Sequence, residues 1–280
     1  MPALVTLALF FFLPVLAAFL MSLTDFDIYC LADVRRARFV LFGQYIRLLQ
    51  DPLFWRATLN TAYFVLVGGP LTILLALMAS LILNSERLRG ARFFRLAVFL
   101  PVITNMVAVA VTWRYLYHPH FGLFNFFLRK VGIGPVDWLG DPRFAMPAII
   151  LLAIWKNFGY HTLIFLAGLQ TIPEDLYSAA RLDGASWLQQ HLHVTLPLLS
   201  RTLGFVTVIT GIGYLQLFAE PYVMTQGGPL NATLSLVLYL YQQGFRWWRM
   251  GYSASVAFVL FAFMLAIGSA SFLRRRRESA

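Results

Sequence analysis

Histidine, cysteine and carboxylate side chains are the groups most able to catalyse a reaction, and this sequence does not arrange them for catalysis. The pairs His118/His120 and His191/His193 have i, i+2 spacing, which points their rings to different faces of a helix. Cys30 is the single cysteine, which excludes an internal disulfide and a cysteine-based metal cage. The nucleotide-binding motif GxxxxGK followed by Ser or Thr is absent, as are HExxH and GxSxG. These absences favour a passive protein part whose energy comes from something other than its own chemistry.

Polar residues inside long apolar runs are a second group of chemical candidates, because a polar side chain in lipid usually faces a cavity or a partner. His161 lies within such a run, and Glu220 is the one carboxylate near the end of another. Helical spacing also gathers polar, aromatic and small residues onto one face of each of two runs. These faces consist of Lys156, Asn157 and Tyr160 in one run and of Thr210, Gly213, Tyr214 and Leu217 in the other. Ordinary helix packing is the alternative, since small and polar residues also hold spans together.

Composition identifies the elements that must position these residues. Of the 280 residues, 60% are hydrophobic and 12% are charged, whereas a soluble domain has about 45–50% apolar and about 25% charged residues. Soluble, fibrous and disordered classes are therefore excluded, and the chain is an integral membrane protein. Its net charge of +10 would suggest nucleic acid in a soluble protein. In a membrane protein, basic residues instead mark the cytoplasmic side, and we expect no nucleic-acid partner.

Apolar runs predict six transmembrane helices, because unpaired backbone groups find no partner in lipid. The runs cover residues 3–23, 58–83, 96–116, 144–170, 202–224 and 252–273. The first run has no basic leader and no cleavage site after it, so we interpret it as a retained span. The abrupt opening at Met1-Pro2 leaves open a start further upstream. The predicted fold class is an all-α integral membrane protein with six transmembrane helices.

Charge predicts the orientation of these helices. The cluster Arg274–Arg277 directly follows the last run, which places this end of the chain in the cytoplasm. An even number of spans puts both termini on that side, together with the basic loop between the second and third runs. That loop carries Arg87, Arg89, Arg92 and Arg95. The two halves show no matching interrupted helices, which argues against a secondary transporter built from inverted repeats.

The predicted cytoplasmic loop 171–201 is the most informative segment. Pro173, followed by two acidic residues, predicts the start of a short amphipathic helix. Gly184 ends this helix, and a second helical stretch over 185–194 precedes Pro197, which opens the fifth span. A helix that rests on lipid is rich in Lys and Arg on its polar face. This one is more acidic than basic, which favours a protein partner over anionic lipid.

The spacing within this loop resembles the EAA loop of ABC importer permeases, with the pattern E-A-A-x3-G-x9-I-x-L-P. The matching positions are Ser178-Ala179-Ala180, Gly184, Val194 and Leu196-Pro197. Ser178 stands where the family usually has glutamate, which affects any salt bridge from that position but not the helix itself. A pattern of this length with fixed spacing is specific, and its place in the predicted cytoplasmic loop agrees with it.

Other segments resemble carbohydrate permeases, and in particular the maltose-type first permease, so that the resemblance covers nearly the whole chain. They are Phe39-Val40, Tyr45, Leu48-Leu49-Gln50-Asp51-Pro52, Phe54-Trp55, Asn60-Thr61, Trp113-Arg114-Tyr115-Leu116, Gly122-Leu123-Phe124-Asn125, Trp155-Lys156, Thr225-Gln226-Gly227-Gly228-Pro229, Asn231-Ala232-Thr233, Tyr239-Leu240-Tyr241, Phe245 and Gly251-Tyr252.

The resemblance implies a type I ABC importer permease that carries sugars, polyols or glycerol phosphates across the bacterial inner membrane. Residues 1–57 would form the first helix and an external loop, 58–273 the permease core, and 274–280 a basic cytoplasmic tail. The implied partners are a second homologous permease in a heterodimer, two ATP-binding cassette subunits, an external solute-binding protein and the lipid bilayer. ATP and Mg would be bound by the partner ATPase, so this chain needs no cofactor and hydrolyses no ATP.

Two sets of site residues follow from the resemblance. The ATPase-coupling loop would use Glu174, Ser178, Ala179, Ala180, Asp183, Gly184, Val194, Leu196 and Pro197. The substrate path would use Lys156, Asn157, Tyr160, Thr210, Gly213, Tyr214 and Leu217, with Gln216 and Glu220 as the next positions. A secondary carrier or channel for a small polar solute is the alternative function. A membrane-embedded enzyme would need paired reactive groups at one depth, and the sequence offers none.

Overall fold

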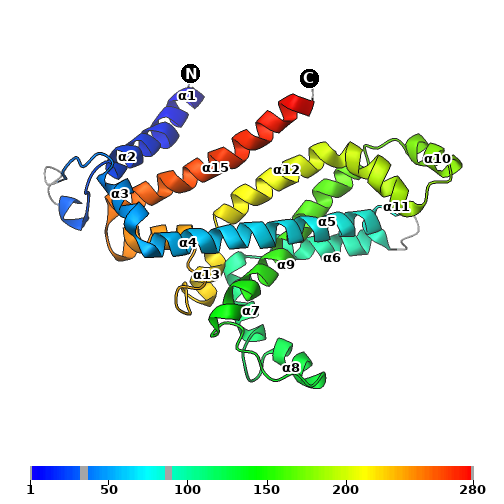
Figure 1. The fold of residues 1–280 in the computed structure, drawn as a ribbon, viewed down its shortest axis with the longest axis horizontal. Coiled ribbons are helices and arrows are strands. Elements are labelled where there is room, and N and C mark those ends of the chain that lie inside the picture. The colour runs from blue at the N-terminus through cyan, green and yellow to red at the C-terminus, as the bar shows by residue number, and fades with distance from the viewer. Residues whose placement is uncertain (1, 32–36, 86–89, 279–280) are drawn as a thin grey trace.

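The structure is a computed structural model that describes residues 2–31, 37–85 and 90–278, without the side chains of Leu31 and residues 270–278. The described part is helical (Figure 1) and contains no β-sheet, only an isolated bridge between Thr24 and Phe39. This confirms the predicted all-α class. Of the arginines used to predict orientation, Arg87 and Arg89 lie outside the described residues, as do the side chains of Arg274–Arg277.

The described residues form fifteen α-helices. The N-terminal half contains α1 (Pro2–Leu7), α2 (Leu13–Ser22), α3 (Gly43–Gln50), α4 (Pro52–Tyr63), α5 (Gly69–Leu83), α6 (Ala91–Ile103), α7 (Met106–Leu116) and α8 (Leu123–Lys130). The C-terminal half contains α9 (Pro142–Leu169), α10 (Glu174–Leu182), α11 (Trp187–Gln190), α12 (Leu196–Leu215), α13 (Ala219–Met224), α14 (Leu236–Tyr241) and α15 (Met250–Glu278). Single π-helical turns join α1 to α2, α4 to α5, and α11 to α12 into longer continuous helices.

Within residues 2–31, 37–85 and 90–278, five helical runs are long and apolar enough to cross a bilayer. They are Pro2–Ser22, Pro52–Leu83, Pro142–Leu169, Trp187–Met224 and Met250–Ser269. The remaining predicted run, 96–116, is not one straight helix, because α6 and α7 meet at a bend of 99°. Pro101 lies in the last turn of α6, and the Asn105 side chain accepts hydrogen bonds from the first backbone N–H groups of α7. Counted as one span, the bent pair completes the predicted six.

The observed run Trp187–Met224, which contains the predicted fifth span 202–224, differs from the prediction at both ends. The second helix of the loop begins at Trp187 rather than Ala185, because Ser186 and Gln189 form a capping box there. It then continues through Pro197 without a break, so Pro197 does not open a separate helix. A proline has no N–H to donate, and the turn before it widens so that the Leu196 N–H reaches the His191 carbonyl. At its other end the run is interrupted between α12 and α13.

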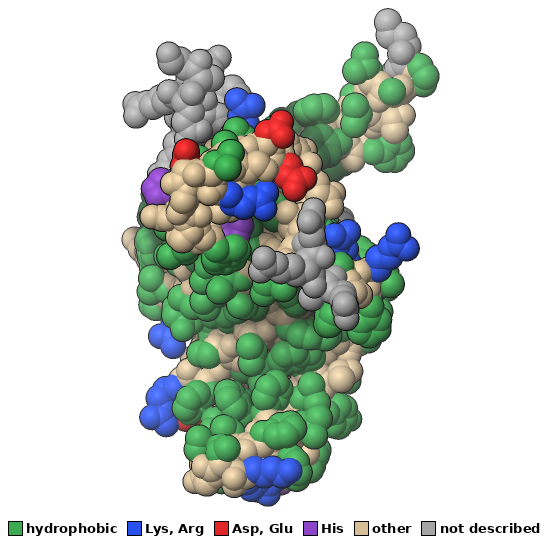
Figure 2. All heavy atoms as spheres, turned by 90° about the vertical axis from the view of Figure 1, so that its right-hand side faces the viewer, with side chains coloured by type: hydrophobic (Ala, Val, Ile, Leu, Met, Phe, Trp, Pro, Cys, Tyr) green, Lys and Arg blue, Asp and Glu red, His purple; other side chains and the backbone are tan. Residues whose placement is uncertain are grey.

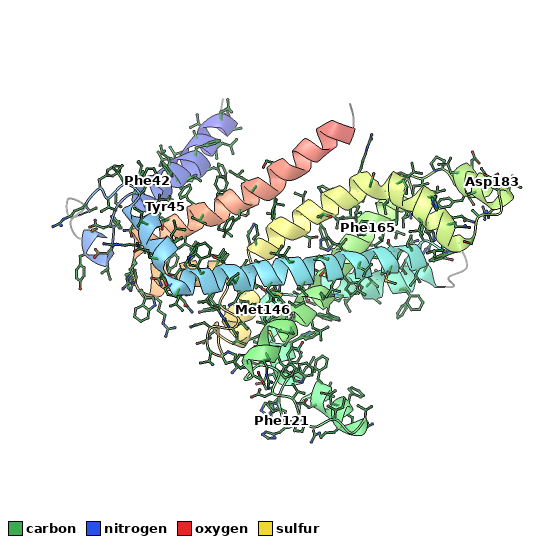
Figure 3. The ribbon with its side chains drawn as sticks, viewed as in Figure 1. Phe42, Tyr45, Phe121, Met146, Phe165 and Asp183 are labelled. Atoms are coloured by element: carbon green, nitrogen blue, oxygen red, sulfur yellow. The ribbon has the colours of Figure 1, made fainter. Side chains whose placement is uncertain are left out.

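Packing around α9 builds the centre of the molecule. α5 lies along α9, and α6 and α12 pack beside it, while α15 packs against α2 and α3. Gly159 allows the close approach of α9 to α6, since an added Cβ would lie 2.0 Å from the Val98 carbonyl oxygen. Figure 3 shows the two ends of the molecule, with Asp183 at the α10 end and Phe42 and Tyr45 at the other.

Exposed hydrophobic side chains cover much of the surface. Figure 2 views the α10 end and shows hydrophobic groups over most of that face, with acidic groups gathered where α10 lies. The most hydrophobic window of the N-terminal run Pro2–Ser22 has no buried residue at all. A soluble protein would not leave such a surface in water. The surface therefore fits a chain surrounded by lipid.

Candidate functional site

A cavity of about 400 Å³ lies between α9 and α12, and we call it the central cavity. All seven residues predicted to line a substrate path border it, and so do Gln216 and Glu220. Its full lining is Phe64, Met106, Lys156, Asn157, Tyr160, His161, Ile209, Thr210, Gly213, Tyr214, Gln216, Leu217 and Glu220. The structure thus brings together the two helical faces that helical spacing and the family resemblance had indicated. Their contact with a substrate stays a prediction.

Lys156 does more than line the central cavity. Its ammonium group donates hydrogen bonds to the backbone carbonyls of Pro101 at 2.6 Å, Val102 at 3.0 Å and Thr104 at 2.7 Å. These carbonyls lie at the end of α6, where the last turn of a helix has no intrahelical donors. The side chain is 8% exposed and therefore does not extend outward to water. Lys156 holds the bend between α6 and α7 in place beside the cavity.

Tyr160 and Tyr214 present different surfaces to the central cavity. The Tyr214 ring is 5% exposed and packs against Phe64 with ring centroids 4.7 Å apart, and its hydroxyl lies 2.7 Å from the Thr72 hydroxyl. Tyr160 is 47% exposed, and its ring meets the edge of His161. Tyr160 therefore offers an accessible aromatic face, while Tyr214 mainly holds helices together.

His161 connects the two helices that form the cavity. Its Nδ1 lies 3.0 Å from the Asn157 carbonyl oxygen, and its Nε2 lies 2.9 Å from the Thr210 hydroxyl. The Thr210 hydroxyl also donates a hydrogen bond to the Val206 carbonyl of its own helix at 2.7 Å, so Thr210 is held from both sides. The sequence left the role of His161 open. The structure shows a buried link between α9 and α12.

Residues 171–201, which follow α9, form a projection at one end of the molecule that we call the hook. Directly after α10, the Gly184 N–H donates to the Arg181 carbonyl and the Ala185 N–H donates to the Ala180 carbonyl. This is the Schellman arrangement of a helix C-terminus. Gly184 has the left-handed φ of +78° that this ending requires. The predicted helix start at Pro173 and its end at Gly184 are confirmed.

The predicted coupling residues are distributed along this hook. Glu174, Ser178, Ala179, Asp183, Gly184 and Pro197 are exposed, and Ala180, Val194 and Leu196 are half-buried. The Ser178 hydroxyl accepts a hydrogen bond from Arg181 of the same helix at 3.1 Å. The position that usually holds glutamate therefore makes a contact within α10. Most of this set remains free to contact a partner.

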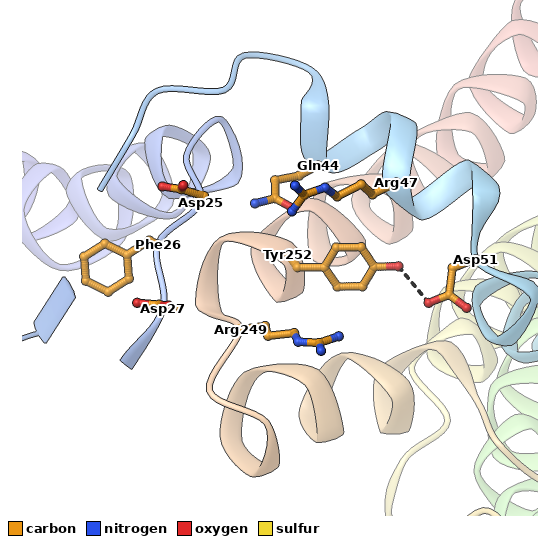
Figure 4. Close-up of a pocket in the computed structure, with 8 residues that line it drawn as sticks. All are labelled: Asp25, Phe26, Asp27, Gln44, Arg47, Asp51, Arg249 and Tyr252. Carbon is orange, nitrogen blue, oxygen red and sulfur yellow. Dashed lines mark hydrogen bonds between the residues drawn. The ribbon is translucent and has the colours of Figure 1, made fainter. Parts of the chain in front are cut away.

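A second cavity, of about 440 Å³, lies beside α3 at the opposite end, and sequence reasoning missed it (Figure 4). Asp51 borders it, caps α4 through the Leu53 N–H, and accepts hydrogen bonds from the hydroxyls of Tyr239 and Tyr252. Burial alone would raise the pKa of Asp51, but these hydrogen bonds hold it below its usual value. The ionised carboxylate ties α4 to α14 and α15. The Asp51-Pro52 pair signals a helix start, but nothing local reveals the distant tyrosines.

In the described part of the chain, five apolar helical runs and one bent pair, a cavity between two of the runs and an exposed helix hook are the features expected of a membrane permease. The family described as "Binding-protein-dependent transport system inner membrane component" matches residues 1–278, and the chain belongs to this family. It is therefore an inner-membrane component of a transport system of the ABC type, and its partners are other components of such a system.

Curated relatives agree over nearly the whole chain. The lactose transport system permease protein LacF of Rhizobium radiobacter is 34% identical over 278 residues, which cover 98% of this chain and 90% of the relative. The trehalose/maltose transport system permease protein MalF of Thermococcus litoralis is 37% identical over 268 residues, covering 95% and 88%. The arabinooligosaccharides transport system permease protein AraP of Bacillus subtilis is 34% identical, covering 95% and 83%.

Solved structures share the fold. A crystal structure of a bacterial alginate ABC transporter, in complex with a periplasmic protein that binds alginate pentasaccharide, matches with a TM-score of 0.82. The match covers 99% of this chain and 92% of that chain at 23% identity. The MetNI methionine ABC transporter matches with a TM-score of 0.59 at 19% identity, covering 81% and 98%. At these identities the likeness shows the fold alone, and it confirms the predicted type I permease architecture.

Proposed function

We propose that this chain is the permease subunit of an ATP-driven, binding-protein-dependent importer for sugars or related polyols. The observation that carries the proposal is the central cavity, which is lined both by an accessible aromatic ring, Tyr160, and by polar residues such as Asn157 and Thr210. Sugars bind through polar groups and through aromatic rings that stack on their apolar faces. The names of relatives that carry lactose, trehalose or maltose, and arabinooligosaccharides support the same class of substrate.

Within the proposed importer, this chain pairs with a second homologous permease, and each of two ATP-binding cassette subunits receives one coupling helix. An external solute-binding protein delivers the sugar. The exposed apolar surface of Pro2–Ser22 and the exposed hook at α10 support such partners. Both termini and α10 lie in the cytoplasm, as expected for six spans with a basic C-terminal tail. ATP and Mg bind to the ATPase, whose closure moves α10.

The experiment that tests this proposal is a binding and uptake assay across a sugar panel. The cognate binding protein is titrated with lactose, maltose, trehalose and arabinooligosaccharides, and the bound sugar is then offered to cells that express the whole system. We expect uptake that requires this chain, the ATPase and the binding protein together. Uptake that persists without the ATPase would instead support a secondary carrier.

ATP hydrolysis gives a second test of the proposed division of labour. Purified alone, this chain should hydrolyse no ATP, because it contains no nucleotide-binding loop of the usual kind. Activity should appear when the ATPase partner is added, and it should rise further with the loaded binding protein. Phosphate release is the measurement, and steady turnover by the isolated chain would contradict the assignment.

Replacing Tyr160 with alanine tests the substrate path. We expect Tyr160→Ala to lower sugar uptake by roughly fivefold, which corresponds to the loss of about 1 kcal/mol of aromatic contact. Tyr160→Phe keeps the ring and should transport normally. Tyr115→Ala is the matched control, since Tyr115 is 64% exposed but does not border the cavity. Membrane abundance is measured for each variant, and normal uptake by Tyr160→Ala would place the sugar elsewhere.

Tyr214→Ala is expected to lower uptake through a different effect. Its buried ring packs on Phe64 and lies close to Gly68, so truncation leaves a void between α12 and the second span. Tyr214→Phe removes only the hydroxyl that meets Thr72. A smaller loss of uptake in Tyr214→Phe than in Tyr214→Ala would assign the residue to packing rather than to sugar contact.

A further inference from the structure

α10 is attached to the rest of the protein by very few contacts. None of its residues is buried, and it packs extensively against no other described helix. A cavity of about 590 Å³ lies between it and the ends of α5 and α9. Figure 1 shows α10 projecting from the end of the bundle. Movement of α10 therefore reaches the bundle through its two flanking peptide segments and through the few side-chain contacts that remain.

One such contact joins Tyr177 of α10 to Thr195, the residue directly before α12. The two hydroxyl oxygens lie 3.0 Å apart, and the His191 Nδ1 lies 2.8 Å from the same Thr195 oxygen. A threonine hydroxyl donates one hydrogen bond and can accept another, so Thr195 serves both partners at once. Among the described residues, this is the one side-chain hydrogen bond that α10 makes to another element. Ser178, at the position that holds glutamate in the related loop, bonds only within α10.

Thr195 is well placed to pass a displacement onward. It is fully buried, so it cannot move without its surroundings. The helix that follows runs continuously from Leu196 to Leu215 and carries Thr210 and Tyr214 of the central cavity. Thr210 lies 15 residues after Thr195, which is about 22 Å along a helix. A displacement of Tyr177 thus acts on the same rigid helix that borders the cavity.

We propose that Tyr177, Thr195 and His191 are positioning residues that link the movement of α10 to α12. This inference rests on the proposed function, in which ATPase closure moves α10. Without the link, α10 shifts within the slack of its flanking segments, and part of each ATP-driven movement does not reach the central cavity. The expected defect is therefore wasted hydrolysis rather than loss of assembly or of sugar affinity.

Two substitutions remove the link with minimal change of shape. Thr195→Val replaces the hydroxyl with a methyl group, and Tyr177→Phe removes only the phenol oxygen. The complete transporter is reconstituted in liposomes. Uptake of the sugar that the panel assay identifies as the substrate is then measured together with ATP hydrolysis. We expect both variants to hydrolyse ATP at close to the wild-type rate. We expect them to carry about fivefold less sugar per ATP, as for the loss of one partly buried hydrogen bond. Thr195→Ser keeps the hydroxyl and should restore the ratio.

The controls remove the same groups elsewhere. Thr207→Val changes an exposed threonine of α12 whose hydroxyl bonds only to the preceding turn, and Tyr115→Phe changes an exposed tyrosine of α7. Both should keep the wild-type ratio. A wild-type ratio in Tyr177→Phe, or an equal loss in Thr195→Ser and Thr195→Val, would overturn the inference. If Thr195→Val does not fold, Tyr177→Phe decides. Failure of the proposed function would give a different result from failure of this inference, because the wild-type complex itself would then carry no sugar with ATP.

Discussion

Gly184→Val should reduce transport at least tenfold while the protein still reaches the membrane. Gly184 ends α10 with a φ of +78°, and an added Cβ meets nothing within 4 Å. The penalty is therefore one of backbone strain, about 1–3 kcal/mol for a β-branched residue in the left-handed region. Valine relieves this strain by changing the turn, which redirects α10 relative to its partner. Sugar uptake at matched membrane abundance is the measurement.

Two variants separate coupling from general destabilisation. Gly132 has a φ of +79° and equally free space around it, but it follows α8, far along the chain from the hook. Gly132→Val therefore imposes the same strain outside the coupling loop, and uptake should be nearly unaffected. Gly184→Asn should retain most activity, because asparagine tolerates the left-handed region. Equal losses for Gly132→Val and Gly184→Val would show that strain anywhere disables the protein, and Gly184 would lose its coupling role.

Lys156→Met should abolish uptake by removing the support of the bend between α6 and α7. Methionine has a similar length and suits lipid, but it donates nothing to the carbonyls of Val102 and Thr104. Each buried carbonyl that loses its donor costs about 1–3 kcal/mol. The bend of 99° lies directly beside the central cavity, so its relaxation changes the cavity wall. Uptake is compared with the amount of assembled complex.

Lys130→Met is the matched control, because Lys130 is the chain's other lysine and lies exposed at the end of α8. It should transport normally. Lys156→Arg is informative as well, since the planar guanidinium cannot direct its donors to three carbonyls around one point as an ammonium does. We expect partial activity from it. Normal uptake by Lys156→Met would mean that the bend holds without its lysine.

Local sequence was sufficient wherever the physical cause is itself local. The apolar runs predicted the helical spans because lipid accepts no unpaired backbone, whatever the neighbours of a helix are. Gly184 predicted the end of α10 because only a few residues tolerate a positive φ. The faces containing Tyr160 and Gly213 were found because residues three or four apart share one side of any helix. The family resemblance then placed these features in a permease, and the family match confirmed it.

Tertiary structure decided the features that join distant segments. Hydrophobicity is the same on both sides of the 99° bend in the apolar run 96–116, so the hydrophobic pattern did not reveal it, although Pro101 and Asn105 are local signals of a helix break. The support of the bend by Lys156, which lies more than fifty residues further along the chain, became visible only in the tertiary structure. The two tyrosines that donate to Asp51 and the contact of Tyr177 with Thr195 depend in the same way on how helices pack. Periodicity tells which residues share a face of one helix, but only packing between helices determines which faces meet.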